Sequence, residues 1–409
     1  MRSYQNFEFP YPLIISEVPE DLSVIVVIPA YYEPEINKTL ASLINNHNFN
    51  GSAEVIIIIN ESDNSSGLVS EFHESQYEYL KNWSKLNSSD KLKFFPVYIK
   101  NIKSKDAGVG IARKIGMDEA YKRFLSGKMG NGIIACLDAD TYVAENYLQT
   151  LVNKADKKNN TKAYSIYFEH DLGAIEDSII LESIIDYELH LRYYINMQRL
   201  IGLPYAYYTV GSAMAVKAYA YGEVFGMNKR QAGEDFYFLH KFTKTGHLDE
   251  INNTKVFPSA RISDRVPFGT GKTILNNYDN NNELLTYDFR SFDALLSMIE
   301  NIDKAYFDSK GFLISLSEPV SAFLDTINVM EKLDEIRKNT TSVNAFIKRY
   351  YAWFDAFQLM KYMHFSRKVY FEDIPVSDAI HHIAKKLKIS DKKSRIEYLD
   401  ELRSRDQNY

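Results

Sequence analysis

Two carboxylates separated by one residue, Asp138 and Asp140, directly follow an apolar run in the segment GIIACLDADT. An uncharged apolar run of this length predicts a buried parallel strand. Ligands of open α/β sheets bind beyond the carboxyl ends of the strands, so we expect both acids at a binding edge. Such oxygen ligands suit Mg²⁺ or Mn²⁺ holding a diphosphate. A three-residue pattern also arises by chance, so the rest of the chain must support it.

A second acidic pair, Glu234 and Asp235, lies at the start of a helix predicted over 232–246. Acids in a first helical turn complement the helix dipole, and position alone favours that structural role. The functional alternative is a general base aimed at an acceptor hydroxyl, with the neighbouring acid orienting it. Two carboxylates for a cation and one for a base would suit sugar transfer from a nucleotide donor.

The elements that must position these acids alternate along the first 140 residues. The predicted strands and helices are, in order, strand 22–30, helix 34–47, strand 53–60, helix 66–83, strand 91–99, helix 107–125 and strand 132–138. Strands alternating with helices predict βαβ units and an α/β fold with a parallel sheet. The strands are continuously apolar, which indicates that helices cover both faces of the sheet.

In the middle of the chain strands and helices alternate less regularly, and in the last third of the chain the apolar residues follow a different pattern. The middle elements are predicted as helix 145–158, strand 162–170, helix 176–200 and strand 208–217. From about residue 290, apolar residues recur with helical spacing. We therefore expect a first domain at 1–289 and a helical domain at 290–409, the latter with a charged tail that frays.

Composition narrows the class of protein. The 409 residues carry a net charge of −6, which argues against a nucleic-acid binder. The single cysteine, Cys136, excludes an intrachain disulfide framework and a cysteine-rich zinc site. No signal peptide and no membrane-spanning run is recognisable, so we expect a cytoplasmic protein. Tyrosines cluster at 183–208, where helix packing is favoured over an aromatic acceptor cleft.

Five segments together resemble the family 2 glycosyltransferases of GT-A fold. In family order they are VIPAYYE (27–33), AGVGIARKIG (107–116), LDADT (137–141), VGSAMAVK (210–217) and GEDFYF (233–238). The resemblance covers roughly residues 22–270. It implies a Rossmann-like mixed α/β sheet, here followed by a C-terminal all-α domain. It also implies a nucleotide-sugar donor, Mg²⁺ or Mn²⁺, a saccharide or lipid-linked acceptor and, usually, inversion at the anomeric carbon.

The resemblance also implies roles for individual residues. Asp140 would be the main metal ligand and Asp138 would approach the metal or the ribose. Asp235 would be the catalytic base and Glu234 its companion. The residues expected around the nucleotide sugar are Pro29, Ala30, Tyr31, Glu33, Asn60, Asp106, Arg113, Asp138, Gly211 and Ser212.

A charged segment, PSARISDRVPFGTGK (258–272), follows the helix of the expected base. The resemblance implies a metal-ligand or phosphate-contacting loop in this region. Asp264 is then a candidate metal ligand, and Arg265 and Lys272 are candidate donor contacts. An ordinary charged surface loop is an equally good interpretation.

The chain departs from the family pattern at two places. The second strand often ends in paired aspartates, whereas here Asn60 and Glu61 follow it, so a UDP- or a GDP-sugar remains open. The sequence Gln-X-X-Arg-Trp of processive membrane synthases is absent, so we do not expect such an enzyme. Two alternatives remain, a nucleotidyltransferase that releases pyrophosphate and a non-catalytic nucleotide- or sugar-binding homologue. The helical segment could clamp the acceptor, form a homodimer or dock peripherally on a membrane.

Overall fold

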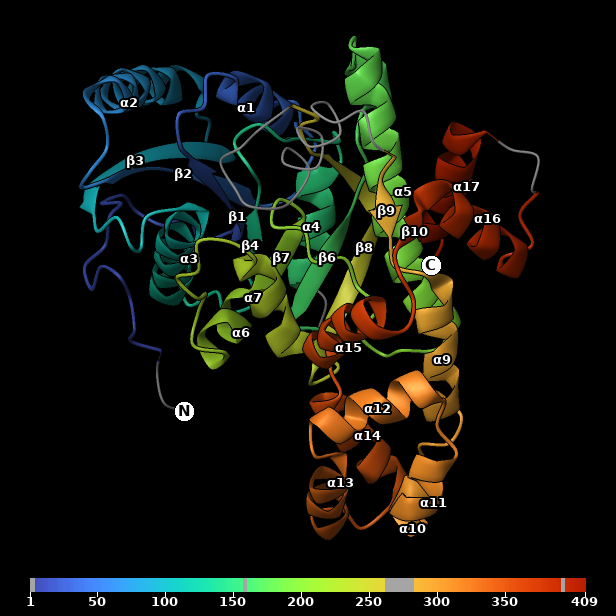
Figure 1. The fold of residues 1–409 in the computed structure, drawn as a ribbon. Helices are drawn as coiled ribbons and strands as arrows, with labels where there is room; N and C mark the ends of the chain where they lie inside the picture. Colours follow the sequence, from blue (N-terminus) through green and yellow to red (C-terminus); the bar gives the residue numbers. More distant parts are fainter. Residues whose placement is uncertain (1–3, 157–159, 262–282, 391–393) are drawn as a thin grey trace.

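The structure is a computed structural model, and it describes residues 4–156, 160–261, 283–390 and 394–409. Within these residues the centre of the fold is an eight-stranded sheet of order β3-β2-β1-β4-β7-β6-β8-β5 (Figure 1). The strands are β1 Leu22–Ala30, β2 Ser52–Ser62, β3 Leu92–Ile102, β4 Ile133–Cys136, β5 Tyr142–Val143, β6 Ala163–Phe168, β7 Met214–Lys217 and β8 Leu248–Phe257.

The sheet is mixed rather than wholly parallel. Strands β3, β2, β1 and β4 run parallel, as the βαβ pattern predicts. Strand β7 is antiparallel to both β4 and β6, while β6 and β8 are parallel. The four predicted strands of the first 140 residues are therefore confirmed, and β7 is where the sheet changes direction. The run that precedes Asp138 forms the central strand β4, which is fully buried.

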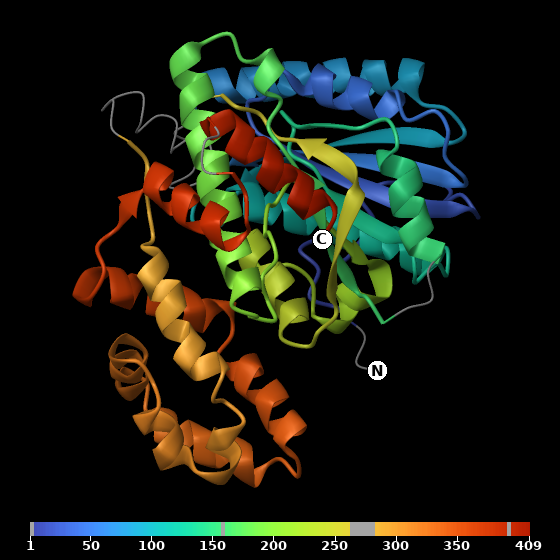
Figure 2. The same ribbon diagram turned by 90° about the vertical axis from the view of Figure 1, so that its right-hand side faces the viewer.

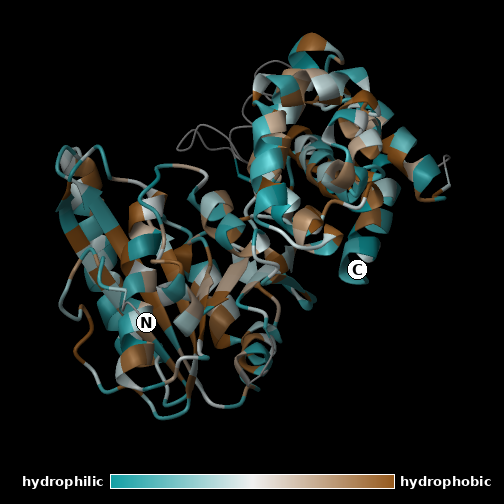
Figure 3. Ribbon diagram, turned by 90° about the horizontal axis from the view of Figure 1, so that it is seen from below, coloured by the Kyte–Doolittle hydropathy of each residue, from teal (hydrophilic) through white to brown (hydrophobic). Residues whose placement is uncertain are grey.

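Helices cover both faces of the sheet, which explains why β1 is apolar without alternation. Alternate residues of β1, beginning at Val24, pack with α1 Ile36–Ile44, α2 Gly67–Asn87 and α4 Tyr147–Asp156. The residues between them, beginning at Ile25, pack with α3 Val109–Ser126, α6 Ala218–Glu223 and α7 Glu234–Thr243. Figure 2 shows α1 and α2 along one side of the strands. In Figure 3 hydrophobic stretches lie along the strands and also alternate with hydrophilic ones along the helices.

The glycines of the segment AGVGIARKIG act in packing. A Cβ atom on Gly116 would lie 2.3 Å from Cγ1 of Val27 on β1, so only glycine allows α3 to approach the sheet this closely. A Cβ atom on Gly110 would lie 1.9 Å from the backbone oxygen of Arg230. These two close approaches fix the position of α3, whose first turns carry Arg113.

A helical region follows the sheet domain and extends away from it (Figure 1). Its helices are α9 Phe289–Ile299, α10 Lys304–Phe307, α11 Ser309–Ile314, α12 Glu318–Thr326, α13 Val329–Lys338, α14 Val343–Trp353, α15 Ala356–Val369, α16 Val376–Lys386 and α17 Arg395–Gln407. The short strands β9 Leu285–Thr286 and β10 Ile374–Pro375 pair beside them. The long helix α5, Ser178–Leu200, joins the same apolar core through Leu189 and Met197. No helix in the described ranges has the length and apolar character needed to cross a membrane.

The expectation of a frayed tail is wrong. Residues Arg395–Gln407 form α17, which begins with a capping box between Ser394 and Glu397. Asp406 in its last turn is only 2% exposed, because it pairs with arginines of α5. Asp406 and Arg403 form largely buried ion pairs with residues of α5, whereas other charges of the tail, such as Asp400, are exposed. Composition alone does not distinguish these two kinds of charge.

Candidate active site

A cavity of about 980 Å³ opens at the carboxyl ends of β1 and β4 and at the first turns of α3 and α7. Most of the candidate residues predicted from the sequence line it: Pro29, Tyr31, Glu33, Asn60, Arg113, Asp138, Asp140, Gly211, Ser212, Glu234 and Asp235. Ala30 is buried in the core instead, and Asp106 is not among the lining residues. Asp264, Arg265 and Lys272 lie outside the described residues.

Arg113 links the two acidic pairs. Its guanidinium forms ion pairs with Asp138, after β4, and with Glu234, in the first turn of α7. The side chain is 4% exposed. Burial alone would lower the pKa of Arg113, but the charges of Asp138 and Glu234 raise it overall, so the group stays cationic. A Cβ atom on Gly211 would lie 2.5 Å from Nη1 of Arg113, so glycine is needed where the guanidinium crosses this segment.

Asp235 differs from its neighbour Glu234 in its surroundings. It forms no ion pair within the described part of the chain, and its carboxylate accepts a hydrogen bond of 2.7 Å from the backbone N–H of Phe236. Burial and the charge of Glu234 raise the pKa of Asp235 to about 6, although Arg113 opposes this shift. A cavity carboxylate with such a pKa can exchange a proton near neutral pH.

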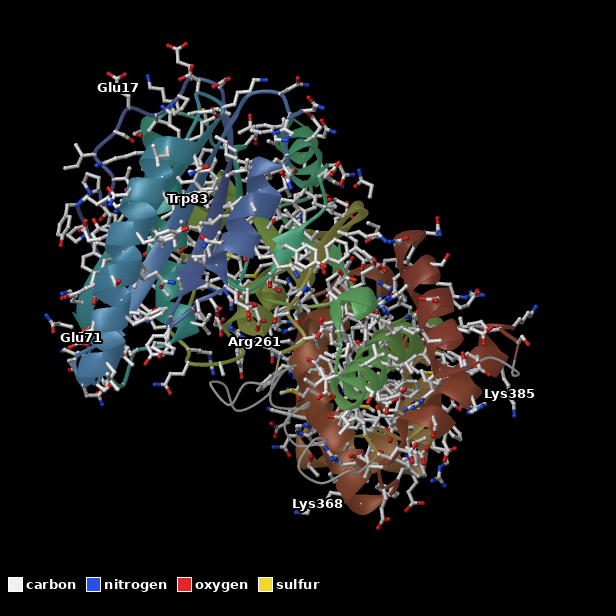
Figure 4. All side chains as sticks on the ribbon, turned by 90° about the horizontal axis from the view of Figure 1, so that it is seen from above. Glu17, Glu71, Trp83, Arg261, Lys368 and Lys385 are labelled. Carbon is white, nitrogen blue, oxygen red and sulfur yellow. The ribbon has the colours of Figure 1, made fainter. Side chains whose placement is uncertain are left out.

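Asp140 is paired with Arg261, a residue that the sequence did not single out. Nη2 of Arg261 lies 2.9 Å from Oδ2 of Asp140, and its Nη1 donates to Oε1 of Glu33 at 2.7 Å. Figure 4 places Arg261 between the sheet domain and the helices. Burial and the charge of Asp138 raise the pKa of Asp140 to about 6, although Arg261 lowers it. Arg261 belongs to the charged segment 258–272 noted in the sequence, but nothing local distinguishes it from the other charged residues there, because Glu33 and Asp140 are both distant in sequence.

The chemistry of the lining residues fits a divalent cation. Among the described residues of the cavity wall, five carboxylates face two guanidinium groups: Glu33, Asp138, Asp140, Glu234 and Asp235 against Arg113 and Arg261. An anionic diphosphate would be repelled by such a surplus unless a cation accompanied it. No cluster of three metal-binding side chains occurs in the described ranges. The protein would thus supply only part of the coordination of such a cation. Asp138 and Asp140 would give two oxygen ligands, and the diphosphate would give others.

Asn60 and Glu61 separate at the end of β2. Asn60 lines the cavity, and its side-chain amide nitrogen lies 3.5 Å from the carbonyl oxygen of Gly108. Glu61 does not line the cavity: it accepts hydrogen bonds from Ser70 of α2, at 2.8 Å, and from Tyr98 of β3. Only Asn60 is therefore placed to meet a ligand in this cavity.

The remaining part of the wall is aromatic. It comes from the end of β6, from α5, from the segment that leads to β7, from Tyr287 after β9 and from α15 of the helical region. Its described side chains are Phe168, His170, Tyr187, His190, Leu191, Tyr194, Ile195, Gln198, Tyr205, Tyr207, Tyr208, Tyr287, Ala356, Met360 and His364. The tyrosine cluster at 183–208 signalled part of this surface, whereas the residues of α15 had no sequence signal.

The mixed sheet, with an Asp-X-Asp after β4 that Arg113 joins to a second acidic pair, has the arrangement of the GT-A fold. Residues 25–220, just under half of the chain, match the family model described as "Glycosyl transferase family 2". The resemblance stated from the sequence is thus confirmed: this segment is a family 2-like glycosyltransferase domain. No curated protein matches the chain.

Two solved structures are distantly similar to this chain. One is TarS (1–349) of S. aureus in complex with UDP-GlcNAc, with 14% identity, a TM-score of 0.38, and coverage of 84% of this chain and 90% of that one. The other is the mannosyltransferase PcManGT of Pyrobaculum calidifontis with GDP-Man and Mn²⁺. Its identity is 13% and its TM-score 0.36, with coverage of 85% of this chain and 91% of that one. Likenesses at this level say nothing about the donor or acceptor of this chain.

Proposed function

We propose that this protein transfers a sugar from a UDP- or GDP-sugar to an acceptor hydroxyl, with Mg²⁺ or Mn²⁺ as cofactor and with inversion at the anomeric carbon. The proposal depends on one observation above all. Arg113 holds Glu234 and Asp138, while Asp235 forms no ion pair within the described residues and has a pKa of about 6. A general base is most effective when its pKa lies near the working pH, so Asp235 suits the deprotonation of a hydroxyl.

In the proposed reaction the acceptor oxygen bonds to the anomeric carbon as the bond from that carbon to the diphosphate oxygen breaks. The hydroxyl proton passes to a carboxylate oxygen of Asp235, and the nucleoside diphosphate leaves with the bonding electrons. Attack from the face opposite the leaving group inverts the configuration. Asp140 and Asp138 would hold the cation, which when bound neutralises charge on the leaving diphosphate. Glu234, fixed by Arg113, positions the backbone on which Asp235 sits.

The nucleoside is proposed to lie against Pro29, Tyr31 and Asn60, which line the cavity beside β1 and β2. The Asn60 side chain is 3% exposed. A primary amide can both donate and accept hydrogen bonds, so Asn60 suits the polar edge of uracil or of guanine. The donor's base is therefore a question for a binding experiment.

The decisive experiment incubates the protein and Mn²⁺ with UDP-, GDP- and dTDP-sugars and measures the phosphorus product. We expect one donor to stabilise the protein against heat and to release nucleoside diphosphate, with EDTA abolishing the release. Release of pyrophosphate from a nucleoside triphosphate would instead identify a nucleotidyltransferase. Donor binding with no release in the presence of any acceptor extract would indicate a non-catalytic homologue.

A further inference from the structure

We propose that the aromatic part of the cavity is the acceptor subsite and that its occupant is an uncharged saccharide. This inference rests on the proposed function, since it names the acceptor of the same reaction. The wall divides by chemistry. Strand ends and the first turns of α3 and α7 supply the acids, whereas α5, the segment 205–208 and α15 supply rings. Gly211 and Ser212 line the cavity between the aromatic segment and β7, so one cavity serves both parts.

The described lining residues of the aromatic part include no acidic side chain and no basic side chain other than histidine. Aspartate, glutamate, lysine and arginine are absent there, and burial lowers the pKa of His190 to about 4, which leaves its ring neutral. Arg367, which also lowers the pKa of His190, is itself paired with Asp373. A phosphate or carboxylate on the acceptor would thus be desolvated here without an opposite charge. An uncharged acceptor fits better.

Two buried polar atoms of this part lack a partner in the described structure. The hydroxyl of Tyr205 and Nε2 of His170 both belong to cavity-lining side chains, which are 5% and 1% exposed. Nδ1 of His170 lies 2.9 Å from Oε2 of Glu188, so Nε2 is the ring nitrogen left to meet an occupant of the cavity. Burial raises the pKa of Tyr205 well above its usual value, so its hydroxyl remains a donor.

Unpaired buried polar atoms are costly, so a natural occupant should supply hydroxyl groups to them. A saccharide does so and also presents C–H faces that pack on tyrosine rings such as Tyr194. An alkyl chain would cover the rings but would leave Tyr205 and His170 unpaired. Rings, unpaired polar atoms and absent charge together favour a sugar over a lipid tail or an anionic group.

The test uses the full-length protein and saturation-transfer NMR with methyl pyranosides of glucose, galactose, mannose and N-acetylglucosamine, and with octyl glucoside. We expect saturation on the ring protons of at least one methyl pyranoside. Tyr205→Phe should reduce the affinity for that glycoside about tenfold, which is the effect of one lost hydrogen bond. Its thermal midpoint should not fall, because the hydroxyl removed has no partner in the free protein.

Tyr147→Phe is the matched control. Tyr147 is also fully buried with an unpaired hydroxyl in the described structure, but it does not line the cavity. Its variant should bind the glycoside like the wild type. Equal glycoside binding by Tyr205→Phe, or no glycoside binding at all, would overturn the inference. Saturation confined to the alkyl protons of octyl glucoside would overturn it in favour of a lipid.

Nucleotide binding with Mn²⁺ is measured in parallel by calorimetry, which separates the two proposals. Nucleotide binding without glycoside binding refutes the saccharide subsite and leaves the glycosyltransferase reaction standing. Glycoside binding that depends on Tyr205, in a protein that binds no nucleotide, supports the subsite and refutes the proposed donor. Loss of nucleotide binding in Tyr205→Phe would also count against an acceptor role.

Discussion

Arg113 determines which of two adjacent acids is available for proton transfer. Glu234 is 2% exposed and paired with this arginine, whereas Asp235 is paired with no cation in the described structure. Because the carboxylate of Glu234 is held by the guanidinium of Arg113, it is not available to contact an acceptor hydroxyl. Two neighbouring acids thus acquire different roles from their environments alone.

Replacement of the proposed base should separate chemistry from binding. We expect Asp235→Asn to reduce sugar transfer by roughly 10²–10⁴-fold, the usual contribution of a general base. Nucleotide binding with Mn²⁺, measured by calorimetry, should stay within about twofold of the wild type, since Asp235 is not a proposed ligand of the donor. Asp249→Asn, an exposed acid on β8, is the control. Normal turnover in Asp235→Asn would remove Asp235 from the mechanism.

The pH dependence follows from the same carboxyl group. The base acts when ionised, so kcat/KM should rise with pH and level off above about pH 6, where Asp235 loses its proton. The stability of the fold changes with pH in the opposite direction to kcat/KM. Because the pKa is raised in the folded state, this group's contribution to stability is present at low pH and is lost as pH rises through about 6. Asp235→Asn should therefore raise the thermal midpoint at pH 8 and leave it unchanged at pH 4.

Arg261 should compete with the cation for Asp140. Its guanidinium contacts Asp140 at 2.9 Å and holds Glu33 as well. We expect Arg261→Gln to bind Mn²⁺ about three- to tenfold more tightly in the absence of nucleotide, because a competing positive charge is removed. Calorimetry with MnCl₂ measures this directly. Arg290→Gln, which removes a pair with Asp288 in the helical region, should leave Mn²⁺ affinity unchanged. Weaker Mn²⁺ binding in Arg261→Gln would contradict the competition.

Among the strands and helices, the sequence pattern predicted those whose conformation depends on residues close together in the chain. Strand β1 was predicted at its observed limits because LSVIVVIPA is an unbroken apolar run. Strand β8 was not predicted, because LDEINNTKVF is mostly polar and only Leu248, Ile251 and Val256 of its apolar residues are buried. Its strand conformation comes from pairing with β6, a partner about 85 residues earlier in the chain. Non-local pairing of this kind leaves little trace in local sequence.

The difference between local pattern and long-range contact also explains which helix boundaries and site residues were predicted. The region from about residue 290 was predicted to be helical without the breaks between its helices. One such break lies at Asn328, whose φ of 52° is left-handed and which separates α12 from α13. The acids of the site could be predicted because they follow recognisable strands and helix starts. Arg261 could not, since its partner Glu33 is 228 positions away.

The contact between α3 and β1 provides a stability prediction. Gly116→Ala should destabilise the protein by about 1–3 kcal/mol, because the new methyl group would overlap Val27. Gly67→Ala is the matched control, since a Cβ atom on Gly67, the first residue of α2, meets nothing within 4 Å. That control should be neutral or stabilising by up to about 1 kcal/mol. Urea unfolding measures both, and equal stabilities would show that α3 can shift to accept the methyl group.

At the scale of the whole molecule, α17 connects the helical region to the cavity. Asp406 lies 2.6 Å from Nη1 of Arg199, pairs with Arg192 and accepts a hydrogen bond of 2.7 Å from the hydroxyl of Tyr208. Tyr208 lines the aromatic part of the cavity. Helices α5 and α17 lie side by side in Figures 1 and 2. The proposed acceptor wall therefore depends on a helix that lies far beyond the matched family segment.

Removal of that carboxylate should destabilise the protein strongly. We expect Asp406→Ala to lower the free energy of unfolding by about 3–5 kcal/mol, because Arg192 and Arg199 would keep buried charges without this partner. Asp400→Ala, in the same helix but 66% exposed, should change it by less than about 0.5 kcal/mol. Denaturant unfolding of both variants is the measurement. A mild effect of Asp406→Ala would mean that water or other groups solvate the two arginines.

The contact between Arg192 and Asp406 also has a consequence during synthesis of the chain. The two residues are 214 positions apart, so Arg192 leaves the ribosome long before its partner is translated. Strands β1 to β4 and the helices between them need only the first 140 residues, and such units can fold as they emerge. Helix α5 cannot reach its final buried state until residue 406 has been translated. The nascent protein should therefore acquire its sheet first, and the proposed acceptor wall only after residue 406 has been translated.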